Sequence, residues 1–461
     1  MARLNGARTM DMTNGPVLGK LIRYAIPLML TSILQLLYNA ADIVVVGRFA
    51  GTVALAAVGA AAPLNNLLVN LFVGLSVGTS VVVAQHYGAE EYEDVRETVH
   101  TAMLLSLISS VLCLLVGVLF HRQLLHLMGT PDNVIDLSAQ YMLILFIGVP
   151  FMLIFNFSAA ILRAVGDTRR PLMILSMTGL LNVGLNLFFV IQCHLSVAGV
   201  ALATTISQGV ATVIIVFLLM REQGCLRFEP TQMRLKKDKA MHIVRVGIPA
   251  GMQGLIFSIS NSLMQSTINT FGDVTMAGNT AAGNLESFLF QTLNAFYQAS
   301  ITFVGQNVGA KKPERLPKII RCCAGCVIVL GATLSTIALQ FRPQLLGLYN
   351  TDPQVIEVGA RRLGVLLPTY VLCGLMDVLN GVLRGMGYSL QPMLLSVFSV
   401  CGMRVLWILV IFPLLPELHL LYLSYPISWA LATLLEVIFF LHCYKKLKSQ
   451  YAGLDNAPAA E

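Results

Sequence analysis

The sequence is poor in charge, since only 11% of its 461 residues are Asp, Glu, Lys or Arg while 56% are hydrophobic. Soluble globular domains carry about 25% charged residues, so an ordinary soluble globule is excluded. The first 20 residues contain no apolar run. We therefore expect no cleavable signal peptide there, and expect the first membrane span to direct insertion.

Motifs for hydrolytic chemistry are missing as well. Neither the phosphate-binding pattern G-x-x-x-x-G-K-[ST] nor the zinc-protease pattern H-E-x-x-H occurs, which argues against ATP hydrolysis and favours an ion gradient as the energy source. All eight histidines fall in loops or at span ends, so a membrane-embedded enzyme has little support. Cys322, Cys323 and Cys326 lie in a predicted span without a second cysteine pair, which favours packing over metal binding.

Long apolar runs are what the sequence does contain. A membrane-spanning helix needs about 20 predominantly apolar residues, and twelve runs qualify. They are 22–47, 53–83, 98–120, 137–161, 172–192, 197–220, 246–270, 276–304, 319–341, 361–383, 392–414 and 418–443. We predict an all-α polytopic membrane protein.

The distribution of Lys and Arg predicts the orientation. With both termini in the cytoplasm, 24 of the 30 basic residues fall inside, whereas Arg361 and Arg362 are among the few placed outside. Basic loops next to an anionic membrane surface account for the net charge of +7 without a nucleic-acid partner. The distribution thus predicts a multi-pass protein with cytoplasmic N- and C-termini.

The chain repeats itself. AQHYGAEE at 84–91 returns as GQNVGAKK at 305–312, IRYAIP at 22–27 as VRVGIP at 244–249, and LRAVG at 162–166 as LRGMG at 383–387. Each half has six spans, so the halves form a parallel repeat, the plan of a transporter that alternates access. The predicted divisions are an N-lobe at 1–220, a cytoplasmic linker at 221–245, a C-lobe at 246–445 and a cytoplasmic tail at 446–461.

These motifs carry a resemblance to a known family. NAADIVVVGR in the first span, VVVAQHYGAEE after the second, LRAVGDTRRP after the fourth, GIPAGMQ in the seventh and VGQNVGAKK after the eighth resemble multidrug and toxic compound extrusion (MATE) transporters. The details are similar to the DinF-type bacterial branch. The resemblance implies twelve helices in two V-shaped lobes. It also implies an antiporter of the cytoplasmic (inner) membrane that exports organic, often cationic, compounds in exchange for H⁺ or Na⁺.

One carboxylate, Asp42, stands well inside the first apolar run. An acid at membrane depth costs roughly 3 kcal/mol on insertion scales, which makes it a candidate functional group. Gln35, Tyr38, Asn39 and Asp42 have the i, i+3, i+4, i+7 spacing of one helix face. This polar face should contact protein or water. The alternative is that Asp42 only bonds neighbouring helices.

The resemblance implies a cation-coupling site at Asp42. Asn182 and Asn186 match an Asn-x-x-x-Asp pair of the fifth span, Thr204 matches a hydroxyl of the sixth, and Pro27 matches a proline at which the first helix bends. Because Asn186 replaces the second acid, the site keeps one carboxylate, which favours H⁺ slightly over Na⁺. Depth supports the grouping, since Asp42, Asn186 and Thr204 all lie about 10 Å below the outer surface. Ordinary helix–helix hydrogen bonding by the amides and the hydroxyl is an equally open alternative.

The second half has different candidates. The seventh span has an uncharged polar stripe that includes Asn261 and Gln265, and the acid of sodium-coupled NorM-like relatives is missing there. Glu286 and Arg404 are both about 15 Å deep, which predicts an ion pair. We favour a structural role for this pair over substrate contact. Asp377 could line the floor of the cleft, and Glu436 is expected at the interface near the basic end of its span.

The leading prediction is a secondary multidrug efflux antiporter. It should act as a monomer, with small organic cations or drugs and membrane lipids as its partners and without an organic cofactor or bound metal. The alternative is a lipid-linked oligosaccharide flippase of the same wider superfamily, which should show a cationic cleft for pyrophosphate. One Arg at mid-membrane against Asp42, Glu286 and Asp377 favours cationic cargo.

Overall fold

The computed structural model describes residues 9–455, and within them all side chains except those at 52, 62–63, 66–68 and 452–455. Every regular element of the described residues is helical. The α-helices are α1 (Val17–Val45), α2 (Thr52–Gly88), α3 (Tyr92–Leu127), α4 (Asp132–Ala164), α5 (Arg169–Leu187), α6 (Ser196–Arg221), α7 (Lys237–Asn269), α8 (Asp273–Gly309), α9 (Leu316–Gln340), α10 (Arg342–Gly347), α11 (Pro353–Leu366), α12 (Tyr370–Gly385), α13 (Leu390–Ser396), α14 (Met403–Leu406) and α15 (Leu418–Asp455).

Short 3₁₀ and π-helical segments connect or extend these helices. The π-helical segments are η1 (Val46–Ala50), η2 (Phe188–Gln192), η7 (Val397–Gly402) and η8 (Trp407–Ile411), and the 3₁₀ turns are η3 (Gly224–Leu226), η4 (Pro230–Gln232), η5 (Pro313–Arg315) and η6 (Leu367–Thr369). Eleven helices of the described residues are long and apolar enough to span a membrane. The predicted eighth span is α8, a 37-residue helix that contains Glu286 and several amide and hydroxyl side chains. Twelve long helical stretches therefore correspond to the twelve predicted spans.

Internal contacts divide the chain into two units. The N-terminal unit combines the described part of Met1–Asp11 with Leu30–Met252, and the C-terminal unit combines Met12–Met29 with the described part of Gln253–Glu461. The first turns of α1 thus belong to the C-terminal unit, and the first half of α7 belongs to the N-terminal unit. The predicted divisions at 220 and 246 do not follow these boundaries, and predicted tail residues 456–461 lie outside the described residues.

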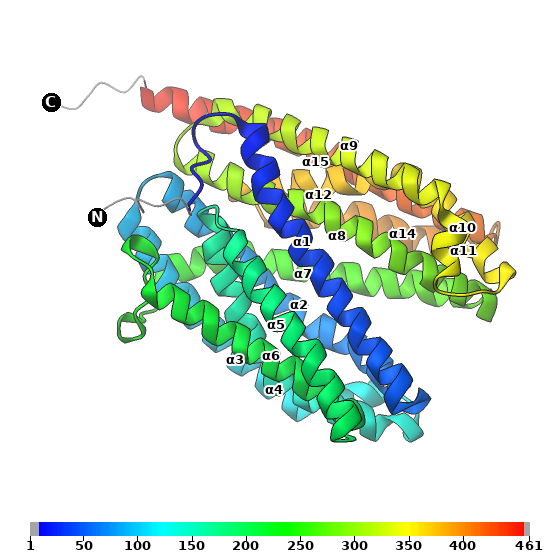
Figure 1. Ribbon diagram of the computed structural model, residues 1–461. Helices are drawn as coiled ribbons and strands as arrows, with labels where there is room; N and C mark the ends of the chain where they lie inside the picture. Colours follow the sequence, from blue (N-terminus) through cyan, green and yellow to red (C-terminus); the bar gives the residue numbers. More distant parts are fainter. Residues whose placement is uncertain (1–8, 456–461) are drawn as a thin grey trace. The chain divides into compact units, whose positions relative to one another are not determined.

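The N-terminal unit is built on close helix packing. Figure 1 shows α3, α4 and α6 side by side, and α4 also packs against α2. Helix α7 approaches α2 through glycines, since a Cβ built on Gly78 would lie 2.2 Å from the carbonyl oxygen of Ile243 and one on Gly74 would lie 2.3 Å from the backbone nitrogen of Gly251. Small residues at such crossings let membrane helices pack backbone to backbone.

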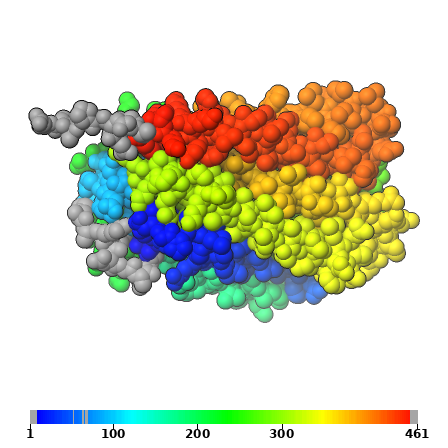
Figure 2. Space-filling model, turned by 90° about the horizontal axis from the view of Figure 1, so that it is seen from above, coloured from blue at the N-terminus to red at the C-terminus, as the bar shows by residue number. Residues whose placement is uncertain are grey.

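The C-terminal unit is centred on α12, which packs against α8, α9 and α15. Tyr24 of α1 joins this unit, where its ring contacts Phe303 edge-on and its hydroxyl lies 2.9 Å from that of Thr302. In the face shown in Figure 2, α15 (red) and α9 (yellow-green) lie at the surface of this unit. The exposed apolar side chains of α15 include Leu434, Ile438 and Leu441, whose spacing gives one helix face suited to contact with lipid.

Candidate functional site

Asp42 lies at the meeting point of α1, α5 and α6 in the N-terminal unit. The side-chain amide of Asn186 donates a hydrogen bond to Asp42 Oδ1, and the Thr204 hydroxyl donates to Asp42 Oδ2 at 3.4 Å. Asn182 completes the group, because its amide donates to Thr204 Oγ1 and its oxygen accepts from Asn186, both at 3.3 Å. The structure therefore brings together the four residues for which the sequence predicted a cation-coupling role.

The local sequence explains this grouping. Asn182 and Asn186 are four residues apart on α5, so their side chains point from the same face. Asn186 is completely buried, and its Oδ1 has no hydrogen-bond partner among the described residues. A carboxylate beside an unpaired amide oxygen is an all-oxygen environment that suits a proton or a hard monovalent cation.

The rest of the predicted polar face of α1 is less tightly engaged. Tyr38 donates to the backbone oxygen of Ser176 at 3.3 Å, whereas Gln35 and Asn39 are exposed. Pro27 lies within α1, which is continuous from Val17–Val45. Of the predicted face, only Asp42 belongs to the candidate site. Tyr38 bonds α5, and the other two side chains are exposed amides.

The predicted Glu286–Arg404 pair is wrong. Glu286 of α8 pairs instead with Arg362 of α11, whose Nε and Nη2 donate to the two carboxylate oxygens at 2.8 and 2.9 Å. Arg362 Nη1 also donates to Asn279 Oδ1 at 3.0 Å. Both charged side chains are buried, so this is a two-pronged ion pair of the kind that the Arg geometry favours.

The error came from placing Arg362 outside the membrane. The tenth apolar run was read as starting at 361, but the helix begins at Pro353, which puts Arg362 about 14 Å along it. The helical spacing of apolar residues continues from Arg362 back to Pro353. Following this spacing would have placed Arg362 inside the helix. The prediction of cationic cargo from one mid-membrane Arg against three acids is weakened, because Arg362 neutralises Glu286.

Arg404 has neutral partners. Its Nη1 donates to Asn261 Oδ1 at 2.9 Å and its Nε to Ser428 Oγ at 3.3 Å, and its guanidinium carbon lies 4.1 Å from the centre of the Tyr425 ring. The predicted polar stripe of α7 thus reaches Arg404 through Asn261. Gln265, by contrast, donates to Asn269 on the same helix at 2.8 Å.

Asp377 is half-buried on α12, and its Oδ2 has no hydrogen-bond partner among the described residues. Glu436 was expected at the membrane interface, and this is wrong, because its side chain is 0% exposed in the core of the C-terminal unit. Helix α15 continues to Asp455, so the basic residues after Glu436 belong to the same helix rather than to a loop.

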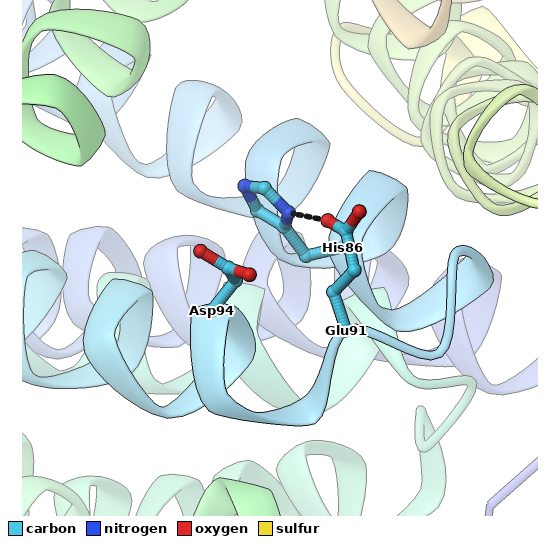
Figure 3. A group of neighbouring side chains, drawn as sticks. All are labelled: His86, Glu91 and Asp94. Carbon is cyan, nitrogen blue, oxygen red and sulfur yellow. Dashed lines mark hydrogen bonds and ion pairs between the residues drawn. The ribbon is translucent and has the colours of Figure 1, made fainter. Parts of the chain in front are cut away.

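A separate charged cluster lies at the turn between α2 and α3. His86, Glu91 and Asp94 approach one another (Figure 3), with ligand atoms all within 4.8 Å. Lys239 supplies a positive charge there, since its Nζ donates to Asp94 and lies 3.2 Å from His86 Nε2, while His86 Nδ1 lies 2.6 Å from Glu91 Oε2. The Lys239 ammonium already compensates the negative charge of this cluster. We therefore assign the cluster a structural role in packing α7 against the turn.

Comparisons with known proteins agree with this architecture. The profile of the MatE family matches residues 27–188 and 249–410, one match in each half of the chain. A Bacillus subtilis (strain 168) protein named Probable multidrug resistance protein YoeA is 28% identical over 432 residues, covering 92% of this chain and 93% of the relative.

Two further similarities come from other organisms. A Shewanella oneidensis protein named FAD transporter is 26% identical over 402 residues, covering 86% of this chain and 87% of the relative. The structure of a MOP superfamily transporter from Pyrococcus furiosus superposes with a TM-score of 0.89 at 24% identity, covering 96% of this chain and 99% of that one. The last similarity supports the twelve-helix, two-lobe fold.

Proposed function

The chain belongs to the MatE family of membrane transporters, and from this premise we propose that it is a multidrug efflux antiporter that exports organic compounds in exchange for H⁺ or Na⁺. Names of relatives that include multidrug resistance support the class of cargo. The parallel repeat supports alternating access as the transport mechanism. We also propose that it acts as a monomer in the cytoplasmic membrane with both termini inside, as the positive-inside rule predicts.

The Asp42 group is the observation that carries the proposed ion coupling. Asp42 is an acid on a helix long and apolar enough to span the membrane, and it accepts hydrogen bonds from the neutral side chains of Asn186 and Thr204. A carboxylate without a cationic side-chain partner can take up and release a proton or Na⁺ without breaking an ion pair. The unpaired Asn186 Oδ1 offers a second oxygen to the ion.

Polar exposure on α7 supports a route for cargo in the C-terminal unit. Asn261, Ser262 and Asn269 are exposed on a membrane-spanning helix, where polar side chains face protein or water rather than lipid. Their amides and hydroxyl can bond varied compounds, and Tyr425 adds an aromatic ring beside Arg404. The neutral polar side chains of this α7 face suit a broad range of organic cargo.

The test is ethidium efflux from liposomes that contain the purified protein, with a pH gradient or a Na⁺ gradient imposed separately. We expect one gradient to drive efflux in the parent and Asp42→Asn to abolish the driven component. Asp136→Asn is the matched control, because Asp136 is an exposed acid paired with Arg122. Full gradient-driven efflux by Asp42→Asn would remove this group from the coupling mechanism.

A second candidate function is a lipid-linked oligosaccharide flippase. Arg404 favours it, because this arginine is 4% exposed and has no carboxylate partner among the described residues, so it could receive an anionic group. Failure of the parent to export ethidium under either gradient, together with gradient-independent movement of a fluorescent pyrophosphate-linked lipid, would favour the flippase.

A further inference from the structure

Glu436 is a buried acid that the ion coupling proposed at Asp42 does not use. It lies in the C-terminal unit on α15 and is 0% exposed. An acid in a membrane helix normally has a partner that compensates its charge. Among the described residues, no Lys or Arg lies within ion-pair distance of Glu436.

The partners of Glu436 are neutral and form a closed triangle with it. Asn380 Nδ2 of α12 donates to Glu436 Oε1 at 2.7 Å, and Ser396 Oγ of α13 donates to the same oxygen at 2.8 Å. Asn380 Nδ2 also donates to Ser396 Oγ at 2.9 Å. All three side chains are at most 1% exposed, so water does not reach the triangle in this conformation.

Two acceptor atoms of this triangle are left unpaired. Glu436 Oε2 and Asn380 Oδ1 are both buried and have no hydrogen-bond partner among the described residues. A buried acceptor without a donor is costly, and an ionised carboxylate in the same place is costlier. A proton on Oε2 removes the larger of these costs, because it neutralises the acid. Water does not reach this triangle, whereas Asp42 is half-buried, so only at Asp42 can water complete the shell of oxygen ligands that Na⁺ needs.

The triangle has the same chemistry as the Asp42 group in the N-terminal unit. Each contains one acid, one Asn that donates to it and leaves its own oxygen unpaired, and one hydroxyl that donates to it. The two groups are not related by the sequence repeat, because the offset of 221 places Ile215 opposite Glu436 and Trp407 opposite Asn186.

A π-helical segment accompanies each group. η2 begins two residues after Asn186, and η7 begins directly after Ser396. π-Helical turns inside α-helices occur frequently at functional sites. At Ser396 this turn gives the helix a place where its hydrogen bonding can be rearranged when the triangle opens.

The arginines near Glu436 bond other residues and do not form an ion pair with it. Asp377 and Arg384 of α12 interact with it electrostatically, and residues 390–402 of α13 and η7 contain no charged side chain. Arg384 donates through Nη1 to the Tyr297 hydroxyl and through Nη2 to Gln253 Oε1. On the other helices packed against α15, Arg362 is paired with Glu286, Arg361 with Glu357, and Arg404 bonds Asn261 and Ser428.

We propose that Glu436, Asn380 and Ser396 form a second monovalent-cation site, occupied by a proton in this conformation and emptied when α12, α13 and α15 move apart. The proton binds to Glu436 Oε2 from water and returns to water, so no other reactant is needed. The occupied site stands independently of the coupling proposed at Asp42, whereas its exchange during transport rests on that proposed function.

Infrared spectroscopy of the purified protein tests the occupied site without transport. A protonated carboxylic acid has a C=O stretch well separated from carboxylate bands, and we expect Glu436→Gln to remove one such band at neutral pH. Asp42→Asn is the comparison variant and should leave that band in place. Ser396→Ala should shift the band to higher frequency, because Oε1 then accepts one hydrogen bond fewer.

Substrate-induced proton release in weakly buffered detergent solution tests exchange. We expect Glu436→Gln to release about one proton fewer per protein than the parent on addition of ethidium. An unchanged infrared band in Glu436→Gln, or a carboxylate band that responds to Na⁺ instead, would overturn the proton site. If the infrared band is lost but proton release is unchanged, the proton is permanently bound and the proposed exchange is wrong, whatever the outcome at Asp42.

Discussion

Asp42 in the N-terminal unit and Glu286 in the C-terminal unit are both acids on membrane helices, but their negative charges have opposite kinds of partner. In the N-terminal unit, Asp42 is held by a neutral amide and a neutral hydroxyl. In the C-terminal unit, Glu286 is held by both prongs of Arg362. A carboxylate locked to a guanidinium is neutralised permanently, whereas one with neutral partners still needs a mobile positive charge. The difference separates an acid suited to structure from one suited to ion exchange.

The turns before α3 and α9 differ in the same sense. Before α3, the Lys239 ammonium binds the Asp94 carboxylate. In the repeated turn before α9, Lys312 binds the backbone oxygen of Thr13 at 3.2 Å and Asn14 Oδ1 at 2.7 Å. The repeated turn thus has an ion pair to a lysine of α7 in one unit and a lysine bonded to neutral oxygens in the other. Salt should weaken the first more than the second.

Breaking the buried ion pair should have the largest effect. Arg362→Met leaves Glu286 buried without its cation, and we expect a loss of about 3–5 kcal/mol of stability. Thermal unfolding followed by tryptophan fluorescence in detergent measures it. Arg361→Met is the matched control, because Arg361 is exposed and pairs with Glu357 on the same helix.

The double variant Glu286→Gln with Arg362→Met sharpens the interpretation. Removing both charges should recover most of the lost stability, because the cost of the single change comes from the unpaired carboxylate. A double variant as unstable as Arg362→Met would show that Arg362 acts through packing against Tyr422 and Tyr425 instead.

The corresponding change in the N-terminal unit should alter ion binding more than folding. Thr204→Val keeps the side-chain shape and removes the hydroxyl that donates to Asp42 at 3.4 Å. We expect the ion concentration for half-maximal efflux to change by about three- to fivefold, the equivalent of one modest hydrogen bond. Thr205→Val is the control, since Thr205 donates to the backbone oxygen of Ile144. Equal effects of both changes would contradict a role specific to Thr204.

The comparison of the two turns predicts a smaller effect. Lys239→Met removes the ammonium from the cluster of Figure 3, and we expect a loss of about 0.5–1 kcal/mol at low salt that shrinks as salt is added. Lys312→Met should show less salt dependence, because Lys312 donates to the neutral oxygens of Thr13 and Asn14. Thermal unfolding at two salt concentrations checks both, and equal salt dependence would count against the distinction.

Labelling of Cys225 tests the packing beside the Lys239–Asp94 ion pair with the smallest perturbation. Burial raises the pKa of this linker thiol to about 11, so at pH 8 only about 0.1% is the reactive thiolate. Maleimide labelling should accelerate about tenfold per pH unit up to that pKa, while exposed Cys193 labels readily at pH 8. Lys239→Met should raise the rate at Cys225. Rapid labelling of Cys225 at neutral pH in the parent would contradict the burial of this thiol.

Sequence reasoning succeeded where depth and periodicity carry the information. Asp42, Asn186 and Thr204 were expected at one level of the membrane, and both Asn186 and Thr204 donate to Asp42. The same reasoning failed for Glu286 and Arg404, because equal depth does not say which helices are neighbours. It also misplaced Glu436, because a nearby cluster of lysines suggested a helix end that α15 does not have.

The sequence by itself determined the class of protein, the twelve helical stretches, the internal repeat and the membrane family, because each depends on the order of apolar and polar residues along the chain. Only the tertiary structure decided which acids receive a cationic partner. That choice depends on which helices lie side by side and on where each helix begins, as Arg362 shows by reaching Glu286 from a helix that starts at Pro353. The pairing of buried charges is a property of packing, because a low-dielectric interior makes every buried carboxylate depend on its immediate neighbours.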